Sequence, residues 1–340
     1  IIVASVDYTH HAYIIRALQA GFDVISEKPM TTDHRKCNAI LEAERRTGRK
    51  GVVTFNARFA RYTTRIKELL KGGAIGEILS VDMEWLLDTS HGADYFRRWH
   101  RRMDKSGGLL VHKATHHFDL VNWWLEEDPV ELYAFGTLRF YGPTRERRGE
   151  RCLTCAYKNE CAFYFDLERR PFHVKYYRRA EAEDGYYRDG CVFAKEIDIY
   201  DTMSVNVRYS GGTLFTYSLI AHSPYEGWKL SINGREGRIE AREFHSGLNG
   251  RVPESTLRLY NRKGEEITYR MPKDLSEHAG SDEALRRMLF VGDLPDPLGH
   301  MADSRAGAMS LMIGDAANIS IRERRPVRIA ELLNDDVAIG

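Results

Sequence analysis

Two short clusters in the sequence carry side chains suited to acid–base chemistry. The first is Glu27-Lys28-Pro29, which directly follows the strand-like run Asp23–Ser26. Loops at the carboxyl ends of parallel strands line the ligand crevice of an open sheet. A lysine there becomes a proton donor or acceptor when burial or a cationic neighbour lowers its pKa. The alternative for these three residues is an ordinary solvated lysine on a loop.

The second cluster lies in Ser106–Asp119, where two glycines precede several histidines. The pattern from Leu110 to Leu125 predicts one continuous helix, which would place His112, His116 and Asp119 on a single face. Such a face favours a histidine acid–base oriented by a carboxylate. The same spacing also suits a metal-ligand set, and partly buried, hydrogen-bonded histidines are the third alternative.

Four of the five cysteines lie within 40 residues of one another, at Cys152, Cys155, Cys161 and Cys191. A Cys-x2-Cys pair followed by two further cysteines is typical of a tetrahedral structural zinc site. Such a site would staple residues 145–191, an insertion dense in charge and aromatics. An iron–sulfur cluster uses the same ligands, and independent thiols are the remaining alternative.

The elements that position these residues follow from hydrophobic periodicity. Strand, helix, strand, helix and strand patterns alternate over the first 57 residues, which predicts parallel βαβ units. After a helix at Phe59–Lys71 the pattern changes to strands joined by glycine-rich turns, which predicts an open, mostly antiparallel sheet. Helices at Ser281–Val291 and Met301–Ile321 close the chain. The predicted fold class is therefore α/β followed by α+β, with domains at 1–57 and 58–333.

Composition excludes several classes of partner for the 340-residue chain. Lys and Arg number 50 and Asp and Glu 49, so no basic excess favours nucleic acid or an anionic membrane surface. No apolar run reaches the roughly 18–20 residues that span a bilayer. We expect neither a nucleic-acid nor a membrane partner, and a cytoplasmic location.

The order of motifs resembles the Gfo/Idh/MocA family of oxidoreductases. Its members carry a strand, Thr-Pro-x-x-x-His, a helix, Ala-Gly, a second strand and Glu-Lys-Pro, matched here by residues 3–10, 20–21 and 27–29. Residues 54–59 and 105–116 resemble the next two family segments, and residues 314–327 resemble the usual ending.

The resemblance implies a Rossmann domain that binds NAD or NADP and a second domain whose open sheet supplies the pocket. It implies hydride transfer between nicotinamide and a secondary alcohol or ketone carbon of a sugar, sugar derivative or cyclitol. It also implies a homodimer or homotetramer formed through the C-terminal sheet. A redox-neutral, glycoside-cleaving enzyme of the same family is the alternative. Two further alternatives are a metal-dependent enzyme and a non-enzymatic member of the family.

By resemblance, Lys28 and His116 are the catalytic residues. His112, also expected to be catalytic, stands where the family has Asp, so either the proton relay runs through His112 and His116 or the substrate differs. The cofactor-binding residues are expected to be Ser5, Val6, Asp7, His10, Glu27, Lys28, Asn56 and Arg58. The substrate-binding residues are expected to be Lys28, Trp99, His112, Lys113, His116 and Asp119. Trp99 belongs to a cationic, aromatic loop at 95–102, for which a solvated surface is the alternative.

One family feature is absent from the sequence. No Gly-x-Gly-x-x-Gly fingerprint, which carries a pyrophosphate on a helix N-terminus, occurs in the chain. The chain opens at what would be about the fourth strand of a Rossmann sheet. We therefore expect a missing N-terminal portion of about 60–70 residues, given about 30 residues for each βα unit.

Overall fold

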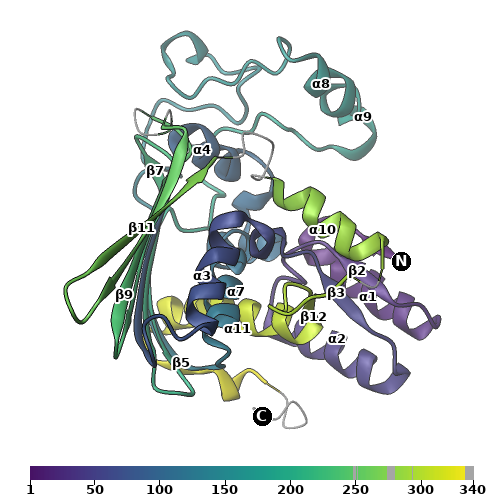
Figure 1. Ribbon diagram of the computed structural model, residues 1–340. Coiled ribbons are helices and arrows are strands. Elements are labelled where there is room, and N and C mark those ends of the chain that lie inside the picture. The colour runs from purple at the N-terminus through teal and green to yellow at the C-terminus, as the bar shows by residue number, and fades with distance from the viewer. Residues whose placement is uncertain (248–249, 251, 274–279, 293, 334–340) are drawn as a thin grey trace.

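Two sheets organise the chain in the computed structural model, which describes residues 1–247, 250, 252–273, 280–292 and 294–333 (Figure 1). The small sheet has the strand order β1-β2-β3-β12, and the large sheet has the order β11-β10-β9-β8-β4-β7-β6-β5-β13. Helices α3, α7 and α11 lie between them. This arrangement confirms the predicted fold class.

The small sheet is built from the first residues of the chain. Its elements are β1 (Ile2–Val3), η1 (Asp7–Thr9), α1 (His10–Gln19), β2 (Val24–Ser26), α2 (His34–Thr47), β3 (Gly51–Val53) and η2 (Asn56–Phe59). The three strands pair in parallel, as predicted. The Asp33 carboxylate accepts the Lys36 N–H and so begins α2, and Gly48 ends it in the left-handed conformation.

A fourth strand, β12 (Ala302–Asp303), returns to pair antiparallel with β3. A strand of two residues is too short to show an alternating hydrophobic pattern, so the sequence did not predict this strand. The domain boundaries at 57 and 58 stay a prediction.

The large sheet is antiparallel except for the β4–β7 pair, which is parallel. Its strands are β4 (Ile78–Asp88), β5 (Pro129–Thr137), β6 (Thr202–Tyr209), β7 (Leu214–Ser223), β8 (Gly227–Gly234), β9 (Gly237–Phe244), β10 (Glu254–Asn261), β11 (Glu266–Pro272) and β13 (Val327–Arg328). Burial alternates along them, so that in β6 Met203, Val205 and Val207 face the core. The predicted open, mostly antiparallel sheet is confirmed.

The remaining helices connect or cover the sheets. They are α3 (Arg61–Lys71), α4 (Thr89–Arg97), η3 (Trp99–Arg101), α5 (Met103–Ser106), α6 (Leu109–His112), α7 (Thr115–Leu125), α10 (Ser281–Phe290), α11 (Ser304–Glu323) and η8 (Ile329–Glu331). Helix α11 packs against α2, α6 and α7. A Cβ at Gly314 would lie 2.3 Å from the carbonyl oxygen of Leu110, so only glycine permits this approach. No helix of the described chain is long and apolar enough to cross a bilayer.

The predicted continuous helix over Leu110–Leu125 is wrong, because α6 ends at His112 and α7 begins at Thr115. The Ala114 N–H bonds to the carbonyl of Leu109, five residues earlier, and this wide turn changes the helical register. His112, His116 and Asp119 consequently do not share one face.

The insertion at residues 145–191 carries only short helical segments, η4 (Lys158–Glu160), α8 (Pro171–His173), η5 (Val174–Arg178) and α9 (Glu181–Asp184). In Figure 1 this teal segment lies above α4, at the top of the molecule. The buried Arg97 of α4 holds it by donating to the Cys152 Sγ at 3.0 Å and to the Phe163 carbonyl at 2.8 Å.

Candidate active site

A cavity of about 760 Å³ opens where the carboxyl ends of β2 and β3 approach the large sheet. Residues from the small-sheet side of its wall are Glu27, Lys28, Thr54 and Asn56. Residues from the opposite side are Tyr62, Trp85, His91, Tyr95, Lys113, His116, His117, Glu226, Glu243 and His245. Helix α10 contributes Ser281, Asp282 and Leu285. The carboxyl end of a parallel sheet is the expected ligand crevice of such a fold.

Lys28 lies in this wall, directly after β2. Its ammonium donates a hydrogen bond to the backbone carbonyl of His112 at 3.3 Å. Burial lowers the pKa of Lys28, while the carboxylates of Asp7 and Glu27 oppose that shift. A lysine with a lowered pKa next to a cavity is suited to exchange a proton with a bound hydroxyl or carbonyl group.

Asp7 and His112 form a buried pair behind Lys28, although 105 residues separate them in sequence. The His112 Nδ1 lies 2.5 Å from the Asp7 Oδ2. Burial raises the pKa of Asp7 to about 7, and Lys28 opposes this shift. Burial also lowers the pKa of His112 well below its ordinary value. Burial disfavours the ionised form of both side chains, so this pair differs from an ordinary surface ion pair.

The ring of His112 is enclosed by aromatic side chains rather than turned to the cavity. The ring centroids of Tyr95, Trp99 and His100 lie 5.6, 5.8 and 4.3 Å from it. Neither His112 nor Trp99 is among the residues that line the cavity. Their predicted contacts with substrate therefore stay predictions that this geometry does not support.

His116, on α7, does line the cavity and lies edge-on to Phe55, at 5.9 Å between ring centroids. The next residue, His117, stacks on Trp85 at 3.8 Å and bonds through Nδ1 to the Tyr217 hydroxyl at 2.6 Å. Lys28 and His116 thus line one cavity from separate elements, and their catalytic roles stay a prediction.

Asp119 and Arg58 bind one another instead of the cavity. The Arg58 guanidinium makes two hydrogen bonds to the Asp119 carboxylate, at 2.8 and 2.6 Å, and both side chains are buried. A third bond reaches the Gly299 carbonyl at 2.9 Å. The pair ties η2 to α7, and neither residue lines the cavity, which disfavours the predicted cofactor and substrate roles.

The other expected cofactor-binding residues occupy the loops after the small-sheet strands. The ring nitrogens of His10 bond to the carbonyls of Ser5 and Pro29, at 2.9 Å each, so His10 joins the loops that follow β1 and β2. Ser5 bonds through its hydroxyl to Thr9, and Val6 is half-buried. Asn56 donates to Asp282 of α10 at 2.6 Å and lines the cavity.

The edge of the cavity carries polar groups whose hydrogen bonds a bound dinucleotide would complete. The Thr54 hydroxyl is buried and, in the part of the chain that the structure describes, has no hydrogen-bond partner. Thr54, Glu27 and Asn56 together present donors and acceptors that suit an amide and ribose hydroxyls. These groups suit the nicotinamide half of a dinucleotide.

Several acids and histidines of the cavity carry no signal in the sequence. His91 of α4 bonds through Nδ1 to both Glu226 oxygens, at 2.9 and 3.0 Å, and through Nε2 to the Tyr95 hydroxyl at 3.1 Å. Burial raises the pKa of Glu243. These residues are single polar positions in a helix, in a loop and near a strand end, and no spacing rule distinguishes them.

The four clustered cysteines of the insertion line one small cavity of about 20 Å³ together with Arg97 and Phe163. All are free thiols, and the Sγ of Cys152 accepts hydrogen bonds from Arg97 and from the Phe165 N–H at 3.4 Å. Across the described residues, no group of three or more His, Cys, Asp or Glu side chains is arranged to hold a metal ion. This finding applies equally to the histidine cluster of Ser106–Asp119.

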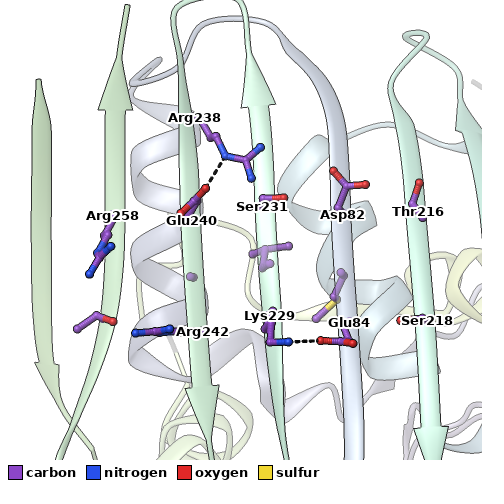
Figure 2. A pocket seen from close by; sticks show the side chains of 14 residues that line it. Asp82, Glu84, Thr216, Ser218, Lys229, Ser231, Arg238, Glu240, Arg242 and Arg258 are labelled. Atoms are coloured by element: carbon purple, nitrogen blue, oxygen red, sulfur yellow. Dashed lines mark hydrogen bonds and ion pairs between the residues drawn. The ribbon is translucent and has the colours of Figure 1, made fainter. Parts of the chain in front are cut away.

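A second hollow, of about 420 Å³, lies on the outer face of the large sheet. Figure 2 shows Asp82 and Glu84 of β4 on one side of it and Arg242 and Arg258 of β9 and β10 on the other. Alternation along β4 directs Trp85 to the inner cavity and these acids outward.

Two family models match the chain. The Gfo/Idh/MocA oxidoreductase C-terminal alpha/beta domain matches residues 67–329, and the NAD-binding Rossmann fold of the same family matches residues 1–55. The second match does not support the expectation of a missing N-terminal portion, which stays a prediction.

Similar curated proteins carry oxidoreductase names. YteT of Bacillus subtilis (strain 168), named as an oxidoreductase, is 42% identical over 350 residues, which cover 98% of this chain and 81% of YteT. The inositol 2-dehydrogenase of Acidothermus cellulolyticus is 34% identical over 135 residues, or 39% of this chain and 37% of that protein. The aligned part of Rhizobium meliloti inositol 2-dehydrogenase, 28% identical over 134 residues, covers 38% of its length.

Solved structures show the same fold at low sequence identity. An aldose-aldose oxidoreductase from Caulobacter crescentus has a TM-score of 0.61 at 15% identity, covering 96% of this chain and 78% of that one. An oxidoreductase from Agrobacterium radiobacter, solved in complex with NAD+, L-tartaric acid and magnesium, has a TM-score of 0.63 at 16% identity, covering 98% and 80%.

Proposed function

The chain belongs to the Gfo/Idh/MocA family of oxidoreductases, and from this premise we propose that it transfers a hydride between a nicotinamide cofactor and a secondary alcohol or ketone carbon of a sugar, sugar derivative or cyclitol. The observation that carries the proposal is the meeting of Lys28 and His116 at one cavity, at the carboxyl ends of the Rossmann strands.

Residues around Lys28 would hold the cofactor. Glu27, Thr54 and Asn56 would contact its nicotinamide half. When bound, the nicotinamide accepts or donates the hydride, which is chemistry that no side chain supplies.

The chain's own residues handle the proton. Oxidation of a carbinol releases the hydroxyl proton, and the imidazole of His116 takes it up. The Lys28 ammonium donates a hydrogen bond to the same oxygen and stabilises negative charge that develops there. The Asp7–His112 pair is a positioning unit, because Lys28 bonds to the His112 carbonyl and lies beside the Asp7 carboxylate.

The test is a substrate panel. Sugars, sugar acids and cyclitols are incubated with NAD+ or NADP+, and reduced cofactor is followed by absorbance. Oxidation of at least one member, lost in Lys28→Ala, supports the proposal. Release of an aglycone from a glycoside with no net reduced cofactor contradicts it in favour of the redox-neutral cycle.

We also propose that the insertion binds structural zinc through Cys152, Cys155, Cys161 and Cys191. Support comes from their shared cavity and from a turn at each thiol, in which the N–H three residues later bonds to the cysteine carbonyl. Metal analysis of the purified protein tests this. One zinc per chain supports it, whereas iron with sulfide, or no metal, contradicts it.

We further propose a homodimer or homotetramer formed through the outer face of the large sheet. A two-fold axis over the hollow would bring Asp82 and Glu84 of one copy near Arg242 and Arg258 of another (Figure 2). Light scattering on Arg242→Glu and Arg258→Glu variants tests this. An unchanged mass in both variants contradicts the interface.

A further inference from the structure

The cations of the active-site cavity differ in how their charge is balanced. Lys28 lies beside the carboxylates of Asp7 and Glu27. Lys273 donates to the backbone carbonyl of Phe244 at 2.7 Å. Lys113 alone among these three lysines makes no side-chain hydrogen bond or ion pair within the described residues.

No carboxylate of the described residues forms an ion pair with Lys113. Its half-buried ammonium lies 5.3 Å from the centre of the Trp85 ring, a cation–π contact. Burial lowers the pKa of Lys113 to about 8, the Lys28 ammonium acts in the same direction, and Glu226 opposes both. Both Glu226 oxygens already bond to His91. Glu226 is therefore engaged elsewhere.

An unbalanced cation on a cavity wall is costly unless a ligand supplies the opposite charge. Polar groups that converge on an otherwise apolar cavity set ligand specificity. The aromatic faces of Tyr62, Trp85 and Tyr95 in the same wall suit a sugar ring. A ring with one anionic substituent fits this combination.

We propose, on the basis of the function proposed above, that Lys113 binds a carboxylate of the substrate and that the substrate class is sugar acids. A carboxylate is favoured over a phosphate because Glu226 and Glu243 lie in the same wall, where a dianion would be repelled. Lys113 is then a specificity-determining residue, distinct from the proton-transfer pair of Lys28 and His116.

The test compares ligands that differ only in charge. Rates with glucuronate, its methyl ester, glucose and glucose 6-phosphate are measured for the wild type, Lys113→Met, Lys113→Arg and Lys105→Met. We expect kcat/KM for glucuronate to exceed that for its ester and for glucose by about 10-fold or more, as one charged hydrogen bond gives. Lys113→Met should abolish this preference, while Lys113→Arg retains most of it. Lys105→Met, the matched control, should leave the ratio unchanged, because the Lys105 ammonium also lies over an aromatic ring, that of Tyr8 at 4.0 Å, but does not line the cavity.

Binding of glucuronate, measured by calorimetry, gives a second readout that does not depend on turnover. Heat of binding in the wild type that is lost in Lys113→Met supports the proposal, even if no ligand is oxidised and the proposed function fails. Equal rates with glucose and glucuronate, a preference that survives in Lys113→Met, or a preference for glucose 6-phosphate overturns it while leaving the dehydrogenase proposal intact.

Discussion

The cavity wall and the insertion use charged side chains in opposite ways. Around the cavity, buried charged side chains pair with partners from distant segments, as Asp7 pairs with His112 and Arg58 pairs with Asp119. In the insertion, Arg151 pairs with Glu181 and Asp189, both within the same 47 residues and at 2.6 Å. The wall is therefore a product of the whole fold, whereas the insertion is a locally organised unit.

Helix α4 is the element that the two regions share. On one side, Arg97 bonds to Cys152 and Asp94 pairs with Arg188 of the insertion at 2.7 Å. On the other, His91 and Tyr95 face the cavity. We therefore expect substitutions around the cavity to change the catalytic rate or the packing of the core. Substitutions in the insertion should change the stability of the fold through its contacts with α4.

The largest effect is expected in the wall. Lys28→Ala and His116→Ala should each lower kcat/KM by about 10²–10⁴-fold, the range that loss of an acid–base group produces. Steady-state kinetics with any substrate found in the panel measures this. Activity within a fewfold of wild type in both variants would remove these residues from the mechanism.

Loss of one member of the Arg58–Asp119 pair should cost about 3–5 kcal/mol in free energy of unfolding, because a buried charge is left without its partner. Urea unfolding of Asp119→Asn measures it. The exposed Arg65–Glu68 pair, at 2.8 Å, provides the control, since Glu68→Gln should cost below about 1 kcal/mol. Equal costs in the two variants would contradict the distinction.

Cys152→Ser should lower the melting temperature by about 5 °C, because it removes one thiolate ligand of the proposed zinc site. Scanning calorimetry with and without a chelator measures this. If the chelator leaves wild-type melting unchanged, the stabilisation does not come from zinc.

Asp7→Asn should change the pH dependence of stability in a defined window. Because the pKa of Asp7 is raised from 3.8 to about 7, its favourable contribution is complete below pH 3.8 and is lost as the pH rises to 7. The variant, which cannot ionise, should gain about 1.4 kcal/mol relative to wild type for each pH unit between 4 and 7. A pH-independent difference between the two proteins would show that Asp7 ionises normally.

The smallest effect is expected at the edge of the insertion. Arg147 and Glu160 form an exposed pair at 3.3 Å, so Arg147→Ala should change stability by below about 0.5 kcal/mol. Urea unfolding measures it, and a cost similar to that of Asp119→Asn would mean that the insertion is not locally organised.

Local patterns in the sequence were sufficient for much of the fold. Alternating strand and helix periods in residues 1–57 predicted the parallel strands, because those periods depend only on which face of an element is buried. The position of Lys28 after β2 followed from the same rule. The glycine-rich turns between 209 and 266 predicted the antiparallel strands for a similar reason.

Tertiary structure alone decided which side chains meet. The break between α6 and α7 turned His112 away from His116 and toward Asp7, and no spacing rule relates residues 7 and 112. Arg58 pairs with Asp119, and Lys113 lies over Trp85 without an ion-pair partner among the described residues. A sequence determines periodicity within an element, but long-range pairing depends on loop paths and crossing elements. The sequence therefore placed Lys28 directly after β2, and the fold decided which side chains surround it.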